Sequence, residues 1–130
     1  MKLGYTIIYV ADVPATVAFY EKAFALPVKF VHESKLYAEM ATGETVLAFA
    51  GEPMAEANGF VINPNRASSA AAAAFEVAFV SDDPKAAFDR AVAAGARAVK
   101  APEQKPWGQI VGYVRDLNGC LVELCSPVTK

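Results

Sequence analysis

The feature that most constrains the fold of this chain is a short pattern that occurs twice. The stretch Leu3–Val10 runs into Asp12 and a proline, and the stretch Ala74–Val80 runs into Asp82 and a proline. Each copy is typical of a β-strand followed by a capping aspartate and a proline in the first helical turn. A shift of 70 residues superimposes the two copies. The pattern therefore predicts two copies of one structural unit.

Both halves continue in the same way, with one helix and then three strands. The helices are predicted from apolar residues at helical spacing: Val13, Val17, Tyr20 and Phe24 in the first half, and Phe88, Ala91 and Val92, before Gly95, in the second. The predicted strands are Val28–His32, Lys35–Ala41 and Glu44–Ala50, then Arg97–Ala101, Gln109–Arg115 and Cys120–Ser126. This order predicts an α+β fold of two βαβββ modules.

We expect a single domain over residues 1–130, with module one in 1–50, a linker or flap in 51–73 and module two in 74–130. A short helix over the alanines of the linker is an alternative. Alternation along the strands puts bulky apolar side chains on one face, and small side chains with Glu76 and Glu123 on the other. An unpaired buried carboxylate is costly. We therefore expect curled mixed sheets around a partly wet cavity, with the helices outside.

Composition and charge exclude several classes of protein. Hydrophobic residues make up 55% and charged residues 20%, which argues against disorder. The net charge is −2 and no basic stripe occurs, so nucleic acid is not an expected partner. No apolar run reaches the ~18 residues of a membrane span, and the N-terminus lacks the pattern of a secretory signal. We expect a cytoplasmic protein without a membrane partner.

The scarce residue types also limit the chemistry. Cys120 and Cys125 lie on one predicted strand about 16 Å apart, too far to form a disulfide, so we expect two reduced core cysteines. His32 is the only histidine, which excludes any site that needs two.

Three segments carry a resemblance to a known family: IIYVADVPATVAFYEKAFAL, FEVAFVSDDPKAAFDRAVAAGA and PWGQIVGYVRDLNGCLVEL. Together with the doubled strand–helix–three-strand order, they resemble the vicinal oxygen chelate superfamily. That superfamily includes glyoxalase I, extradiol dioxygenases, fosfomycin-resistance enzymes and bleomycin-resistance proteins. The last segment is the most specific, because an aspartate-containing turn before a strand ending in Val-Glu-Leu is typical there.

The resemblance implies a divalent metal site in the enzymatic members. Its four ligand positions fall on Tyr5, Ala48, Glu76 and Glu123, and only Glu123 matches. The shift of 70 residues would pair Tyr5 with Phe75 and reverse the face, but the alignment with the family favours Glu76. Zinc, nickel or iron sites of this family use imidazole ligands, and none of these four positions is a histidine, so we expect no metal and no cofactor. A weak Mn or Mg site through Glu76 and Glu123 is the alternative.

The resemblance and the missing ligands favour metal-independent binding of a small, partly apolar molecule, as in bleomycin-resistance proteins, for sequestration or detoxification. The candidate ligand-binding residues are Tyr5, Glu76, Trp107, Tyr113 and Glu123. Three of them have a structural alternative: plain packing for Tyr5, an ion or hydrogen-bond pair for Glu123, and a subunit-interface anchor for Trp107.

Three other functions stay open at the level of the sequence. The first is a lyase or isomerase that uses Mn or Mg through Glu76 and Glu123. The second is a metal-free acid–base enzyme, in which Glu123 is the only catalytic candidate. The third is an interaction module whose cavity is filled by its own side chains. In each case we expect a homodimer, the commonest assembly of soluble proteins.

Overall fold

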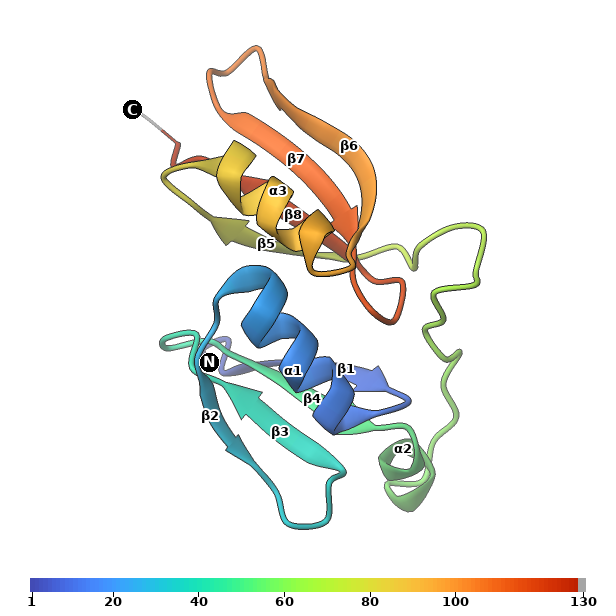
Figure 1. Cartoon of the computed structure of the whole chain (residues 1–130). Helices are drawn as coiled ribbons and strands as arrows, with labels where there is room; N and C mark the ends of the chain where they lie inside the picture. Colours follow the sequence, from blue (N-terminus) through green and yellow to red (C-terminus); the bar gives the residue numbers. More distant parts are fainter. Residues whose placement is uncertain (129–130) are drawn as a thin grey trace. The chain divides into compact units, whose positions relative to one another are not determined.

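A computed structural model describes residues 1–128 of the chain and is drawn in Figure 1. It contains two βαβββ modules, each with a four-stranded mixed sheet, which confirms the predicted α+β class. The chain divides into two compact units, Met1–Asn65 and a second unit that begins at Arg66. Within residues 1–128 no helix has the length and apolar character needed to cross a membrane. The curl of the sheets and the cavity stay predictions.

The first unit contains one sheet and two helices. Its elements are β1 (Tyr5–Val10), α1 (Val13–Phe24), β2 (Val28–Val31), β3 (Tyr37–Met40), β4 (Val46–Gly51) and α2 (Pro53–Ala57). The strand order is β1-β4-β3-β2, with β1 parallel to β4 and the other pairs antiparallel.

The second unit repeats this plan with one helix. Its elements are β5 (Glu76–Val80), α3 (Pro84–Ala93), β6 (Arg97–Gln104), β7 (Ile110–Arg115) and β8 (Leu121–Cys125). The strand order is β5-β8-β7-β6, again with a parallel first pair. Each crossover helix therefore connects the edge strand of its own sheet to the far side of that sheet.

Both long helices begin at a capping aspartate: Asp12, as the sequence pattern indicates, and Asp83, the neighbour of Asp82. The Asp12 side chain accepts a hydrogen bond from the amide of Ala15 at 3.0 Å, and the Asp83 side chain accepts one from the amide of Ala86 at 3.1 Å. Each bond satisfies an amide that would otherwise lack a partner in the first helical turn. The two modules thus share one local device for turning a strand into a helix.

The positions of these caps correct the register of the repeat. The capping aspartates differ by 71 residues, and the same shift takes Tyr5 to Glu76, the first residues of β1 and β5. The shift of 70 was wrong by one residue, because Pro14 is the second residue of α1 whereas Pro84 is the first of α3. Tyr5 and Glu76 are therefore equivalent positions, as the alignment with the family requires.

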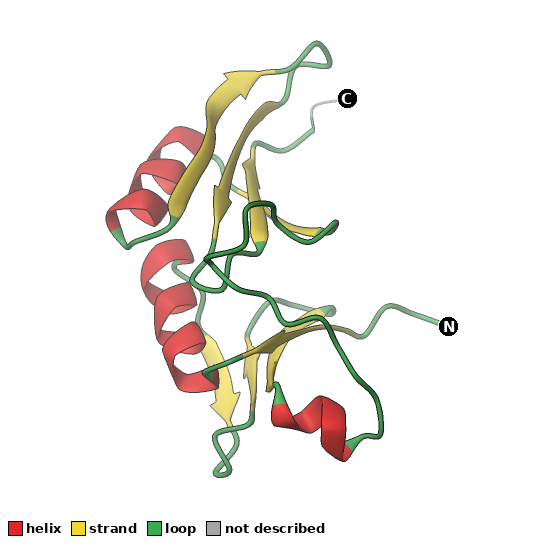
Figure 2. Cartoon of the chain, turned by 90° about the vertical axis from the view of Figure 1, so that its right-hand side faces the viewer, coloured by secondary structure: helices red, strands yellow, loops and turns green. Residues whose placement is uncertain are grey.

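The core of the first unit lies between α1 and one face of its sheet. The ring of Tyr20 packs 4.7 Å from that of Phe49 and 5.0 Å from that of Phe24, measured between centroids. Tyr20 and Phe49 are fully buried. This agrees with the predicted division of each strand into a bulky apolar face and a face of small side chains: Phe49 faces the helix, and Ala48, the next residue along the strand, faces away. Figure 2 shows α1 on one side of this sheet and α2 on the other.

The linker divides between the two units. Its first part forms α2 and then returns to β1, where the ring of Phe60 meets that of Tyr9 edge-on at 5.8 Å. The Asn65 amide also donates to the Tyr9 carbonyl, at 3.4 Å. The alternative of a helix over the alanines is wrong, because residues 70–74 contain no helical turn. A few alanines cannot repay the cost of nucleating a helix without packing.

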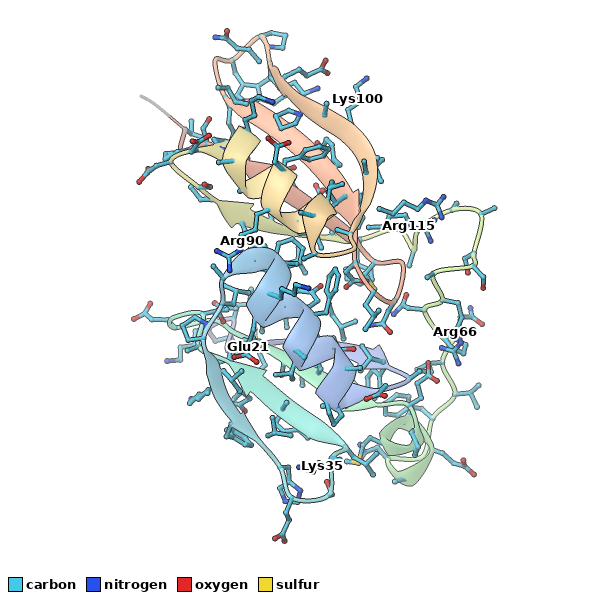
Figure 3. All side chains as sticks on the ribbon, in the orientation of Figure 1. Glu21, Lys35, Arg66, Arg90, Lys100 and Arg115 are labelled. Carbon is cyan, nitrogen blue, oxygen red and sulfur yellow. The ribbon has the colours of Figure 1, made fainter. Side chains whose placement is uncertain are left out.

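The second part of the linker is held by Arg115, which is buried at the end of β7 (Figure 3). Its Nε donates to the carbonyl of Gly119 at 2.8 Å, and its Nη1 donates to the carbonyl of Ser69 at 2.9 Å. This side chain therefore closes the β7–β8 turn and fixes the segment that leads into β5.

The two cysteines are free and buried, as predicted. Burial raises the pKa of the Cys120 thiol to about 12 and that of the Cys125 thiol to about 11. Both thiols therefore stay protonated at neutral pH, which makes them poor nucleophiles.

Candidate functional site

Three of the predicted site residues share one face of the second sheet. Glu76 pairs with Leu121, and Glu123 pairs with Ala78 on one side and with Tyr113 on the other. Paired residues point to the same face, so Glu76, Tyr113 and Glu123 point together, away from the buried side of β8. Glu76 and Glu123 occupy diagonal positions on adjacent strands, within reach of long side chains.

Glu123 is the electrostatic centre of this group. Burial raises the pKa of the Glu76 carboxyl, and the charge of Glu123 and a hydrogen bond to it raise it further. Burial also raises the pKa of Tyr113, followed by the charges of Glu123 and Glu76 and a hydrogen bond to Glu123. Burial, a hydrogen bond to Glu123 and the charges of Glu123 and Glu76 likewise raise the pKa of the Cys125 thiol. Glu123, a carboxylate in this core strand, thus raises the pKa of each of these three neighbouring groups.

The two carboxylates do not make a metal site of the kind that the enzymatic relatives need. Ala48 offers no donor atom, and Tyr5 replaces the imidazole of the first strand. Within residues 1–128, no three His, Cys, Asp or Glu side chains come together in a way that could hold an ion. The residues present therefore do not fit a divalent metal of that family, which prefers imidazole with carboxylate.

Trp107 lies in the turn between β6 and β7, exposed to solvent. Its Nε1 donates to Oε1 of Gln109 at 2.8 Å, and the amide of Gln109 donates to the carbonyl of Ser126 at 2.9 Å. This chain of bonds fixes the indole beyond the Ile110 end of the sheet. Glu76 lies at the opposite end of the sheet, next to Leu121, so the structure does not bring Trp107 to Glu76.

Tyr5 belongs to the first unit and begins its edge strand. It pairs with Val46 and shares a face with Ile7 and Tyr9, the face opposite α1. Its side chain is 58% exposed. The hydroxyl is accessible, but Tyr5 and the three residues of the second sheet lie in different units.

The same face of the first unit carries a carboxylate that the sequence analysis missed. Glu39 is only 7% exposed. Its Oε2 accepts a hydrogen bond from the Tyr37 hydroxyl at 2.8 Å, and its Oε1 lies 3.5 Å from Nζ of Lys29. Glu39 pairs with Ala48, so it stands one strand away from the vacant ligand position of the first module.

A signal for this residue is present in the sequence. Glu39 lies between Ala38 and Met40 in a predicted strand, just as Glu123 lies between Val122 and Leu124. A charged residue between two apolar ones in a core strand indicates a polar face. The same pattern predicted polar-face positions for Glu76 on β5 and Glu123 on β8, and it predicts one for Glu39 on β3 as well.

Comparisons with known proteins agree with the fold. The family model of the Glyoxalase/Bleomycin resistance protein/Dioxygenase superfamily matches residues 2–124. No curated protein matches the chain.

Solved structures share the fold at low sequence identity. A glyoxalase/bleomycin resistance protein/dioxygenase family enzyme from Burkholderia phytofirmans PsJN is 22% identical, with a TM-score of 0.82 over 99% of this chain and 100% of that one. A glyoxalase-related enzyme from Fulvimarina pelagi is 19% identical, with a TM-score of 0.81 over 98% and 88%. TioX from Micromonospora sp. ML1 is 22% identical, with a TM-score of 0.71 over 97% and 98%. The match of the family model over nearly the whole chain, on this doubled fold, shows that the chain belongs to the glyoxalase/bleomycin resistance protein/dioxygenase superfamily.

Proposed function

We propose that this chain is a metal-independent small-molecule-binding protein, of a sequestering or detoxifying kind, that binds its ligand on the sheet faces opposite α1 and α3, which we call the open faces. The observation that carries the proposal is the group formed by Glu76, Tyr113 and Glu123 on a core sheet. A sheet with only a structural role gains nothing from placing two carboxylates side by side, since like charges repel.

The proposed ligand contacts are the five predicted residues: Tyr5, Glu76, Trp107, Tyr113 and Glu123. In the second unit, Glu123 and Tyr113 supply hydrogen-bonding groups next to small or apolar neighbours such as Ala78. Such a surface suits a molecule that is partly apolar and carries a few polar groups. Trp107 offers an exposed ring for stacking at the turn.

The independence from metal follows from the donor set. A residue without donor atoms occupies the fourth-strand position, and a phenol occupies the first-strand position. We also propose that the protein works as a single-domain homodimer in the cytoplasm, which sedimentation and fractionation would test. The arrangement of the two modules within or between chains is part of that question.

A thermal melt of chelator-treated protein tests the proposal. We expect Mn²⁺, Mg²⁺, Ni²⁺ and Zn²⁺ to leave Tm unchanged, and one or more members of a library of small aromatic and polar molecules to raise it. A ligand at about 100 times its Kd stabilises the fold by about 2.7 kcal/mol, a shift of several degrees in a domain of this size. A saturable shift with one ion that is lost in Glu123→Ala would instead make this a Mn- or Mg-dependent lyase or isomerase.

A second candidate is a metal-free acid–base enzyme. It is favoured by one observation, the position of Glu76 beside Glu123 on one face, where burial and the charge of Glu123 raise the pKa of Glu76, since carboxyls perturbed in this way are typical of functional sites. In this reading Glu123 acts as the base, and Glu76 lies beside it on the same face of the sheet. Turnover of a library hit, lost in Glu123→Gln while binding persists, would establish the enzyme over the binding protein.

A further inference from the structure

The open face of the first unit carries a cluster that the proposed ligand contacts do not include: Glu39, Tyr37 and Lys29. Glu39 stands in the middle row of the sheet, between Ala48 on β4 and Phe30 on β2. It is nearly inaccessible, yet it lies on the face opposite the helix. A buried carboxylate needs partners to offset its desolvation, so the nature of these partners shows what the face can accept.

The first partner makes the cluster an acceptor of hydrogen bonds. The Tyr37 hydroxyl donates a hydrogen bond to Oε2 of Glu39 at 2.8 Å. Burial raises the pKa of Tyr37, and so do the hydrogen bond to Glu39 and the charge of Glu39. The phenol therefore stays protonated at neutral pH, and its O–H group stays hydrogen-bonded to the carboxylate. Only the lone pairs of the Tyr37 oxygen remain for other molecules, and they accept.

The second partner is a cation that is loosely held. Lys29 lies in the bulge between Val28 and Phe30, with its Nζ 3.5 Å from Glu39. The lysine side chain is 56% exposed, whereas the glutamate side chain is 10% exposed. An ion pair with a solvated lysine contributes little stability. The ammonium of Lys29 thus occupies a place beside Glu39 that another cation can take.

Two pairs of aromatic rings lie on the same face of this sheet. The ring of Phe30 lies 6.0 Å from that of Tyr37, and the ring of Phe60 meets that of Tyr9 at 5.8 Å, measured between centroids. Between the two pairs, β4 carries Ala48 and Ala50, which are buried, so the accessible part of this face beside Glu39 is formed by Lys29 and Phe30. Rings of this kind attract flat molecules and cations.

We infer that the open face of the first unit binds, at its accessible part around Lys29 and Phe30, a flat aromatic molecule that carries an ammonium or amidinium group. Glu39 and Tyr37 accept hydrogen bonds from the cationic group, which replaces the ammonium of Lys29. This inference rests on the proposed function and adds the chemical class of the ligand. A carboxylate or phosphate in the same place would set a negative charge against a buried one, which is strongly unfavourable.

Three matched indoles test the charge of the ligand. Tryptamine, tryptophol and indole-3-propionate share one ring and one chain length, and they end in a cation, a neutral hydroxyl and an anion. Titration of ¹⁵N-labelled protein, followed by NMR, gives each Kd and the strands whose amides shift. We expect tryptamine to bind at least about tenfold more tightly than indole-3-propionate, the usual value of a hydrogen bond to a charged group, with shifts in β3 and β4.

Variants locate the preference. Glu39→Gln should reduce the difference between tryptamine and indole-3-propionate to less than about threefold, and Tyr37→Phe should reduce it in part. Lys29→Met should strengthen the binding of tryptamine, because it removes the competing ammonium. Glu44→Gln, in the exposed β3–β4 turn of the same unit, changes the net charge equally and should have no effect. A melt of each variant verifies that it folds.

The outcomes separate this inference from the proposed function. A preference for the anion, or a preference for tryptamine that persists in Glu39→Gln, overturns the inference and leaves the proposed function in place. Binding that Lys29→Met does not strengthen shows that Glu39 and Lys29 form a structural pair only, and also overturns it. If no indole binds while the library yields another ligand, the inference fails alone; if the library yields none, both fail.

Discussion

The two modules share one backbone plan but bury their helices to different extents. Helix α1 buries five side chains against its sheet: Val13, Thr16, Val17, Tyr20 and Ala23. Helix α3 buries two, Pro84 and Ala91. Strand β4 is buried along its whole length, whereas β6 is exposed along nearly all of it. Stability in the first module therefore depends on helix–sheet packing more than it does in the second.

The open faces differ in another way. In the second module Glu123 stands on β8 and Tyr113 on the adjacent β7, whereas in the first module the equivalent of Glu123 is Ala48 and the equivalent of Tyr113 is Glu39. The carboxylate of the first module, Glu39, thus lies one strand away from the position equivalent to Glu123, but in the same row of the sheet. The row, rather than the individual strand position, thus carries the polar chemistry in this chain.

The largest expected effect concerns the unequal helices. Tyr20→Ala removes a fully buried ring that contacts Phe49 and Phe24, and it should lower the free energy of unfolding by about 3–5 kcal/mol. Phe88→Ala, at a half-buried position of α3, should lower it by about 1–2 kcal/mol. Urea unfolding measures both. Equal losses in the two variants would show that the modules depend equally on their helices.

The next prediction compares two glycines in equivalent turns. Gly43 in the β3–β4 turn and Gly119 in the β7–β8 turn both have positive φ, 95° and 84°. An added Cβ at Gly43 meets nothing within 4 Å, whereas at Gly119 it would lie 2.6 Å from the carbonyl oxygen of Arg66 and 2.8 Å from Nη2 of Arg115. Only the second glycine is covered by the linker.

Gly43→Ala should therefore cost only the backbone strain, about 1 kcal/mol, and Gly119→Ala should cost about 2–3 kcal/mol or more. Urea unfolding of the two variants gives the difference, which reports how firmly the segment after Arg66 is packed on its turn. If the two alanine variants lose the same free energy, the segment yields to the new methyl group and the comparison fails.

The doubled fold can be predicted from the sequence because each module contains its own local sequence signals. A run of β-branched residues, a capping aspartate and an early proline specify the strand-to-helix transition through short-range hydrogen bonds. The exact register of the repeat is harder to predict. The internal shift of 70 residues was wrong by one, because it matched Pro84 with Pro14, although the two prolines differ in their position relative to the cap. Residue type alone does not state whether a proline is first or second in its helix.

The site was readable only in part, for a physical reason. The pairing of Glu76, Tyr113 and Glu123 follows from strand parity once β5, β7 and β8 are known to be neighbours. The pair of Glu39 with Lys29 depends on the bulge in β2, which turns the lysine toward the face. Bulges break the period of two and leave no clear mark in sequence.

A smaller effect is expected at the ends of the two long helices. α1 ends at Ala25, which is left-handed with φ 56°, whereas α3 ends next to Gly95, which takes φ 110°. Alanine is strained in this region and glycine is not. Ala25→Gly should raise the free energy of unfolding by about 0.5–1 kcal/mol, and Gly95→Ala should lower it by about as much or more. A loss of stability in Ala25→Gly would mean that the methyl group contributes packing that offsets its strain.

The smallest effect separates the open faces by their dependence on pH. The pKa of Glu76 is raised above its ordinary value of 4.5, so the folded chain holds this proton more tightly than the unfolded chain does. The stabilising contribution is fully present below the ordinary pKa and is lost as the pH rises through the raised one. Glutamine cannot ionise, so Glu76→Gln should match the wild type near about pH 4 and become more stable than it toward about pH 8.

Because Glu76 is an exposed residue, this gain should stay below about 1 kcal/mol. Urea unfolding across the pH range measures it, and Glu103→Gln on β6 is the matched control. Lys105 and Lys100 lower the pKa of Glu103, so its contribution is present above the ordinary pKa and lost on acidification. The two variants should therefore differ from the wild type with opposite signs at neutral pH. A Glu76→Gln curve parallel to the wild type would mean that Glu76 and Glu123 do not share their charge on this face, and the second module would then lack the coupled carboxyl pair on which an acid–base function depends.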